Sequence, residues 1–429
     1  MVSCVGVLYV YRRTLPCIAL VATLLMPLPV FFAAPHRVMF LAGTVQALAA
    51  MAFWSVEVGG RYAGLWAVPA WPLLTLFPPA ALHALLISCG VFPLFIFGFI
   101  LTAGPRWQGA GELSQRDFLP AFFLLASGWL LVWVALSLPR LLVAGIALAV
   151  VGWIAVALTL TRIARHRATD REHIAFVALA AWLGAAGLGA FGAVAAGGAP
   201  LWARLGTSLA VWGFLLPVFL TVAHRMLPFF TSSAVPGYVV HRPAWALRTL
   251  LGLSLAHGAL TFLEQTQWLW LVDVPAALVA WRLKWLWWSR AAMQNRMLAV
   301  LHLAFAWLGV AFALFALQSM ARGVLPGFLG QAPLHALTLG FFASMLLGMA
   351  SRVTMGHSGR PVAADNAMWW AFCMMQVAAI MRVVSEWPAL PAAHPLMWLS
   401  SVLWLGAFAL WAGRFAPAFW RRRADGKPG

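Results

Sequence analysis

Charged residues are scarce in this sequence: they make up 9% of its 429 residues, whereas apolar residues make up 64%. A water-soluble domain needs far more charge to cover its surface, so the composition excludes that class. Acidic residues are the scarcest of the charged groups, with 10 Asp and Glu against 28 Lys and Arg, giving a formal net charge of +18. That excess resembles a nucleic-acid binder, but its placement along the chain indicates otherwise, as described below.

Cysteine is also rare, and several catalytic signatures are absent. Cys4, Cys17, Cys89 and Cys373 stand singly with no C-x-x-C, which argues against a zinc site or a thiol redox pair. The sequence contains no P-loop, no H-E-x-x-H and no nucleophile elbow. Whether the protein is an enzyme is therefore left open by its motifs.

Long apolar runs are abundant. A helix of about 20 apolar residues crosses the ~30 Å hydrocarbon layer, and in lipid only helices or closed barrels satisfy the backbone. The runs are too uniformly apolar for alternating barrel strands. We therefore predict an all-α, polytopic membrane protein of about 12 transmembrane helices, near 37–57, 78–103, 118–138, 141–161, 173–196, 204–228, 243–263, 266–289, 297–319, 332–356, 364–385 and 395–416.

Positive charges fall almost entirely on one set of the connecting loops. With the N-terminus placed in the cytoplasm, only five of the 28 basic residues lie on the outer side, leaving 28 − 5 = 23 on the inner side. The positive-inside rule then predicts both termini in the cytoplasm, and the lipid bilayer rather than nucleic acid as the partner. The five outer residues are Arg61, Arg140, Arg204, Arg322 and Arg382.

Three segments make up the predicted domain organisation. Residues 1–35 form an N-terminal segment that lies on the membrane surface or inserts partly; the alternative is a thirteenth span at Thr14–Pro35. Pro27, Pro29 and Pro35 argue against a straight helix there. Residues 36–420 form a single transmembrane helical domain, and residues 421–429 form a basic cytoplasmic tail.

The second, sixth and tenth spans resemble one another. Each runs from outside to inside and ends near an arginine, at Arg106, Arg225 and Arg352, with spacings of 225 − 106 = 119 and 352 − 225 = 127 residues. This favours three quasi-repeats of four helices. The alternative is that topology alone supplies one arginine at each inner end.

A repeated tetrapeptide, "LHAL", begins two of these spans. It occurs at Leu82–Leu85 and Leu334–Leu337, placing His83 and His335 at matching depth about one turn inside the outer face. A histidine inside a span is rare and marks a functional site by default. Because neutral imidazole is a common axial ligand of haem iron, we predict that this pair binds a haem b. The alternative is two interfacial histidines bonded to neighbouring carbonyls.

Other polar residues extend this hypothesis. Arg382, at the outer end of the eleventh span, is a candidate partner for the haem propionates; the alternative is interfacial snorkelling. His257 is a candidate metal ligand or a packing histidine. Asp273, inside the eighth span, indicates a proton or ligand route, or a hydrogen bond to a carbonyl freed near Pro275.

The remaining histidines divide by depth. A second metal cluster on the inner side is one interpretation of His224, His302 and His357; the alternative is that near-interface histidines are simply hydrated. We place His36, His166, His173 and His241 in loops and His394 at the outer face.

Four stretches resemble the NnrS family of bacterial membrane proteins: "HRVMFLAG" (His36–Gly43), "GFILTAGPRWQG" (Gly98–Gly109), "HRMLPFFTS" (His224–Ser232) and "HALTLGFFASMLLGMASRVTMGHSGRP" (His335–Pro361). The resemblance covers about residues 28–420. It implies a multi-pass protein of the bacterial inner membrane that contains haem and copper. It also implies a role in nitric oxide metabolism or relief of nitrosative stress, with nitric oxide or nitrosylated iron species as partners.

One departure from the family pattern bears on the site. Many members carry W-H-x-H-E-M before the "GF-LTA" element; here His83 matches the first histidine, while Leu85 and Leu86 replace the second histidine and the glutamate. The layout is also similar to subunit I of the haem-copper oxidases, but the His-Pro-Glu-Val element is missing and fold analogy does not establish function.

Three functions fit the sequence. The first is a haem protein acting on nitric oxide or nitrosylated iron. The second is a transporter of a small solute or metal ion, with Asp273 and the inner histidines along its path. The third is a haem-based sensor or scaffold without turnover.

Overall fold

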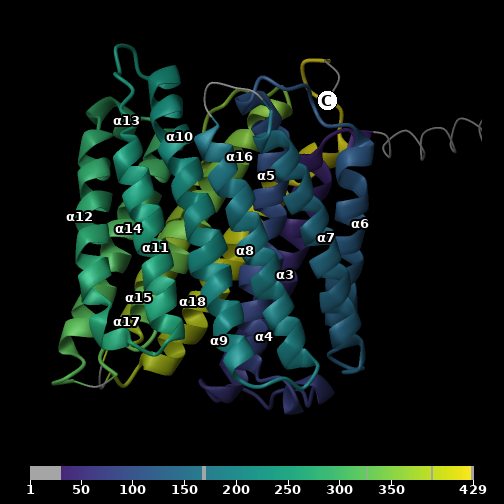
Figure 1. Cartoon of the computed structure of the whole chain (residues 1–429), viewed down its shortest axis with the longest axis vertical. Coiled ribbons are helices and arrows are strands. Elements are labelled where there is room, and N and C mark those ends of the chain that lie inside the picture. The colour runs from purple at the N-terminus through teal and green to yellow at the C-terminus, as the bar shows by residue number, and fades with distance from the viewer. Residues whose placement is uncertain (1–29, 167–170, 326, 388–389, 427–429) are drawn as a thin grey trace, which may run out of the picture.

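The computed structural model describes residues 30–166, 171–325, 327–387 and 390–426. Within these ranges every regular element is helical and no strand occurs, as the sequence predicts. The expectation of a surface-lying or inserted segment at Thr14–Pro35 falls largely outside the described residues. The predicted polytopic helical fold is confirmed for the part of the chain that can be described (Figure 1).

Single helices account for eight of the predicted spans, and one further span ends in a short extra helix. They are α3 (Pro35–Arg61), α6 (Gln115–Val134), α7 (Leu141–Ala164), α8 (Glu172–Ala195), α11 (Ala244–Phe262), α12 (Trp270–Leu286), α14 (Arg296–Ala321), α17 (Asn366–Val384), and α18 (Ala393–Phe415) followed by α19 (Pro417–Trp420). Short helices lie in the connections: η1 (Pro72–Thr75), η4 (Thr266–Trp268) and α13 (Arg290–Gln294).

Three spans are built differently, each as two α-helices joined by a π-helical segment. The second span is α4 (Pro79–Leu85), η2 (Leu86–Val91) and α5 (Phe92–Trp107). The sixth is α9 (Leu201–Ser208), η3 (Leu209–Leu215) and α10 (Leu216–Ala234). The tenth is α15 (Ala332–His335), η5 (Ala336–Ala343) and α16 (Ser344–His357).

Helices thus occupy all twelve predicted positions, and ten of them are long and apolar enough to cross a membrane. The two that fall short are α11 and α12. The first carries Arg248 and His257, and the second has only 17 residues and carries Asp273. Both run alongside the longer helices in Figure 1.

Both ends of the described bundle lie at the same face of the molecule. The side chain of Arg37, at the start of α3, donates hydrogen bonds to the backbone oxygens of Ala418, Phe419 and Arg421 at 3.3, 3.2 and 3.0 Å. Carbonyls at a helix C-terminus lack helical partners, and the arginine supplies one. An even number of passages therefore separates the two ends, as predicted; the assignment of that face to the cytoplasm stays a prediction from charge.

The three π-containing spans are the most enclosed. In their apolar stretches 83%, 83% and 78% of residues are buried, against 33–61% in the other seven candidate spans. They meet at a triad of rings: Phe92 and Phe219 have centroids 5.9 Å apart, Phe92 and Phe342 5.9 Å, and Phe219 and Phe342 4.7 Å. These spans are the centre of the molecule.

The π-helical segments also give the predicted repeat a physical signature. Gly90, Gly213 and Gly340 each occupy the fifth position of their segment, with spacings of 213 − 90 = 123 and 340 − 213 = 127 residues. Arg225 and Arg352 keep the second spacing, whereas Arg106 lies four residues out of register. The fold therefore supports three quasi-repeats.

Local sequence explains why the ladder widens at these positions. Pro93 and Pro217 follow η2 and η3 closely, and proline lacks the N–H that an α-helical ladder requires. In the tenth span Ser344 follows η5, and its hydroxyl donates to the carbonyl of Leu339 at 3.2 Å. Each central span is thereby rewound about one to two turns inside its outer end.

Candidate functional site

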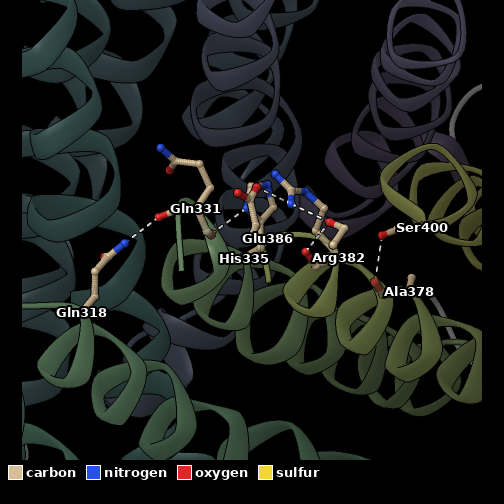
Figure 2. A network of polar contacts seen from close by, with 9 residues as sticks. Gln318, Gln331, His335, Ala378, Arg382, Glu386 and Ser400 are labelled. Atoms are coloured by element: carbon tan, nitrogen blue, oxygen red, sulfur yellow. Dashed lines mark hydrogen bonds and ion pairs between the residues drawn. The ribbon is translucent and has the colours of Figure 1, made fainter. Parts of the chain in front are cut away.

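His335 lies at the end of α15, immediately before η5. Its Nδ1 is 2.9 Å from the carbonyl oxygen of Gln331 (Figure 2). Because a carbonyl only accepts, this hydrogen bond assigns the proton to Nδ1 and leaves a lone pair on Nε2. A backbone carbonyl on one ring nitrogen is the common way in which metal-binding histidines are oriented. The imidazole is therefore prepared for a ligand at Nε2.

His83 lies in α4 and is oriented by stacking. The ring of Trp54, from α3, is parallel to the imidazole within 16°, with centroids 4.1 Å apart. Within the described part of the chain no hydrogen bond ends on this imidazole, and its Nδ1 is buried without a partner. A buried ring nitrogen with no partner is costly unless something binds the ring.

Arg382 of α17 completes this outer-end cluster. Its charge acts on both imidazoles, and the two imidazoles act on each other. Its Nη1 lies 2.5 Å from Oε1 of Glu386 and donates to Oγ of Ser385 at 3.0 Å (Figure 2). The structure therefore brings His83, His335 and Arg382 together, with a carboxylate that the sequence did not suggest already paired to the arginine.

The predicted equal depth of the two histidines is only approximate. The "LHAL" copies are 335 − 83 = 252 residues apart, whereas the repeat measured between Gly90 and Gly340 is 250. His335 adjoins η5 directly, whereas His83 precedes η2 by three residues. At about 1.5 Å per residue, the offset is about 3 Å along the helix axis.

The glycines one to two turns further in do not provide open space for a flat ligand. A Cβ on Gly340 would lie 2.4 Å from the ring of Trp307, and one on Gly90 would lie 2.7 Å from Nε2 of Gln46. Both glycines therefore admit a neighbouring side chain at close range, which is a packing role.

His257 belongs to a second, fully buried site. Its Nδ1 is 2.7 Å from Oδ1 of Asp273, and the two side chains are 1% and 0% exposed. Trp212, from η3, stacks on the imidazole with centroids 3.5 Å apart, and Phe315 meets it edge-on at 4.7 Å. The expected hydrogen bond from Asp273 to a carbonyl near Pro275 is wrong: its partner is an imidazole on the adjacent helix, and its Oδ2 has none.

The inner histidines are separated from one another. His224 contacts His173, with Nδ1 and Nε2 3.1 Å apart, and its own Nε2 lies 3.2 Å from the carbonyl of Pro243. His302 places Nε2 3.1 Å from Oγ1 of Thr231. The predicted three-histidine cluster is therefore not assembled. Among the described residues no group of three or more His, Cys, Asp or Glu is placed to hold a metal.

His357 pairs instead with His36, their ring centroids 4.6 Å apart at 40°. Sequence reasoning placed both His36 and His173 in loops, and this is wrong. They lie in the first turns of α3 and α8 and are 4% and 8% exposed. Pro35 at the first helical position was the available signal for His36, because proline favours that position.

Together these features define a polytopic helical membrane protein with a paired-histidine cluster at one end of its central spans, a buried histidine–aspartate pair, and two further histidine pairs. The sequence matches the family model described as NnrS protein over residues 30–423, and the chain belongs to this family. The resemblance seen in the sequence is thus confirmed over nearly the whole chain. A search of curated proteins finds no match.

Proposed function

We propose that this protein is an integral haem protein of the bacterial inner membrane, acting in nitric oxide metabolism or relief of nitrosative stress. His83 and His335 bind a haem b between the second and tenth spans. The observation that carries the proposal is His335, whose Nδ1 is held by Gln331 and whose Nε2 keeps its lone pair, beside a second imidazole that lacks any hydrogen bond.

The donor set fits this group. Two neutral imidazoles are a suitable axial pair for haem iron, and haem needs no third protein ligand. A haem bound in this way supplies one-electron transfer, because two histidines leave no open position at the iron. The chain itself contributes orientation, through Gln331 and Trp54, and an arginine beside both rings.

A reaction that requires an open position has a second candidate in His257. Its hydrogen bond to Asp273 is the carboxylate–histidine arrangement that orients metal ligands, and its Nε2 carries no hydrogen bond among the described residues. Copper rests on the family resemblance alone. The described residues hold no group of three or more donors, so we assign no copper ligands.

The transporter alternative receives less support from these contacts. It depended on Asp273 and the inner histidines following one path. Asp273 is paired with His257 and fully buried, and the inner histidines are bonded in separate places. A sensor or scaffold without turnover shares the haem site and differs from the enzyme only in activity.

The reduced-minus-oxidised absorption spectrum of the purified full-length protein tests the proposal. We expect the bands of a low-spin b-type haem at about one haem per chain. Loss of nitric oxide in proteoliposomes with a chemical reductant then separates an enzyme from a sensor. A colourless protein from haem-replete cells would contradict the haem assignment and return the transporter to first place.

Arg382 gives a further prediction because it is paired with Glu386. A cation near the haem favours the reduced state, so Arg382→Leu is expected to lower the midpoint potential. At an effective dielectric constant of about 20, a unit charge about 10 Å away contributes about 1.7 kcal/mol, or roughly 70 mV. Glu386→Gln is the matched control and is expected to shift the potential upward.

Redox titration of both variants checks the assignment. Opposite shifts support a charge beside the haem, and a lowered haem content in Arg382→Leu supports binding of the propionates. Unchanged potential and haem content in both variants would leave Arg382 as an interfacial residue that snorkels toward water.

A further inference from the structure

A small cavity lies between the three central spans, adjacent to the phenylalanine triad. Its volume is about 40 Å³, and α5, α10 and α16 each contribute to its wall, with Phe40 of α3. Phe219 belongs both to this wall and to the triad. The cavity is therefore enclosed where the three quasi-repeats meet.

The lining is apolar throughout. Aromatic and aliphatic side chains form most of it, and Met345 and Met349 add two thioethers. Ten of the eleven lining residues are buried, the exception being Phe99. A buried water needs two to four polar partners, and this lining offers none, so the cavity is dry.

Size and polarizability together select the class of occupant. The volume exceeds the roughly 10–15 Å³ that one water requires and is far below the roughly 150 Å³ of a cavity that binds benzene. Dispersion holds such an occupant, and sulfur and aromatic carbon are the most polarizable groups a protein can place around it. A charged or strongly hydrogen-bonding molecule would lose its hydration without compensation.

We propose that this cavity is a binding site for a small, neutral, weakly polar molecule of about two heavy atoms, in the class of a dissolved diatomic gas. The site does not depend on bound haem, because none of its lining residues belongs to the histidine clusters. Its position between the central spans places such a molecule inside the bundle, at higher concentration than in water.

Methionine methyl groups report directly on occupancy. The full-length protein in detergent is labelled with ¹³C at its methionine methyls, and Met345→Leu and Met349→Leu assign the two signals. Under xenon pressure we expect both signals to shift and saturate, whereas Met375, which is fully buried in α17 and outside the cavity, does not respond. Dissolved dioxygen, which is paramagnetic, is expected to broaden the same two signals first.

Ala350→Leu supplies the second arm, because it fills the cavity from its wall. The xenon and dioxygen responses of Met345 and Met349 are expected to be lost; Val218→Ile, with one added methyl group, tests the same point with less strain. Equal responses at all three methionines, no response at any, or an undiminished response in a folded filled variant would overturn the proposal.

Discussion

Replacing His335 by alanine is expected to remove most of the haem and the low-spin spectrum, and His83→Ala is expected to do the same. Each imidazole supplies one of two axial ligands, and even the outer hydrogen bonds of such ligands change metal affinity about 10–100-fold. Haem per protein and the spectrum are measured on each purified variant. His394 is a matched control, because it lies at the same end of the bundle but is exposed, so His394→Ala keeps full haem.

The two variants also test each ligand separately. His335 is held by a hydrogen bond and His83 only by the ring of Trp54, so their orientations have independent causes. Full haem with an unchanged spectrum in one variant removes that residue as a ligand. The same result in both would redirect the assignment to the inner pairs, His36 with His357 and His173 with His224.

Hydropathy and charge predicted the fold because they reflect the bilayer, which acts on each span alone. Length and apolar composition are local properties, so all twelve positions are helical even where α11 and α12 are less apolar. The three π-helical segments were not predicted. Pro93 and Pro217 were visible, but η5 has no proline beside it, and its widening involves the Ser344 hydroxyl.

The site was predictable only as far as rarity of residue type reaches. His83 and His335 are noticeable because a histidine seldom lies inside a span. Glu386 and Trp54 looked like ordinary interfacial residues, and only packing shows one against Arg382 and the other against His83. Register failed for the same reason: "LHAL" is a local match, and the repeat measured by glycines differs from it by two residues.

Partners distant in sequence were beyond the pattern altogether. His36 and His357 are 357 − 36 = 321 residues apart, and their contact depends on how α3 packs against the tenth span. His257 and Asp273 were both identified, but as separate features of consecutive spans. Their hydrogen bond arises because α11 and α12 are antiparallel neighbours that bring two buried polar groups to one level.

That pair gives the second large effect. Asp273→Leu is expected to destabilise the protein by about 3–5 kcal/mol, the typical consequence of removing one partner from a buried charged pair. Asp273→Asn retains an oxygen that accepts from Nδ1 of His257, so it is expected to lose less, about 1–2 kcal/mol. The free energy of unfolding is measured by SDS titration in mixed micelles, followed by circular dichroism.

The double variant His257→Leu with Asp273→Leu separates the pair from its surroundings. Replacing both polar partners with apolar groups leaves no unpaired atom in the dry site, so we expect most of the lost stability to return. Additive losses would show that each residue acts alone. Because Trp212 stacks on the imidazole, the double variant also removes the only histidine this site could offer a metal. A restored fold with an unchanged low-spin spectrum, but without nitric oxide loss, would therefore assign the open position to His257 and leave electron transfer to His83 and His335.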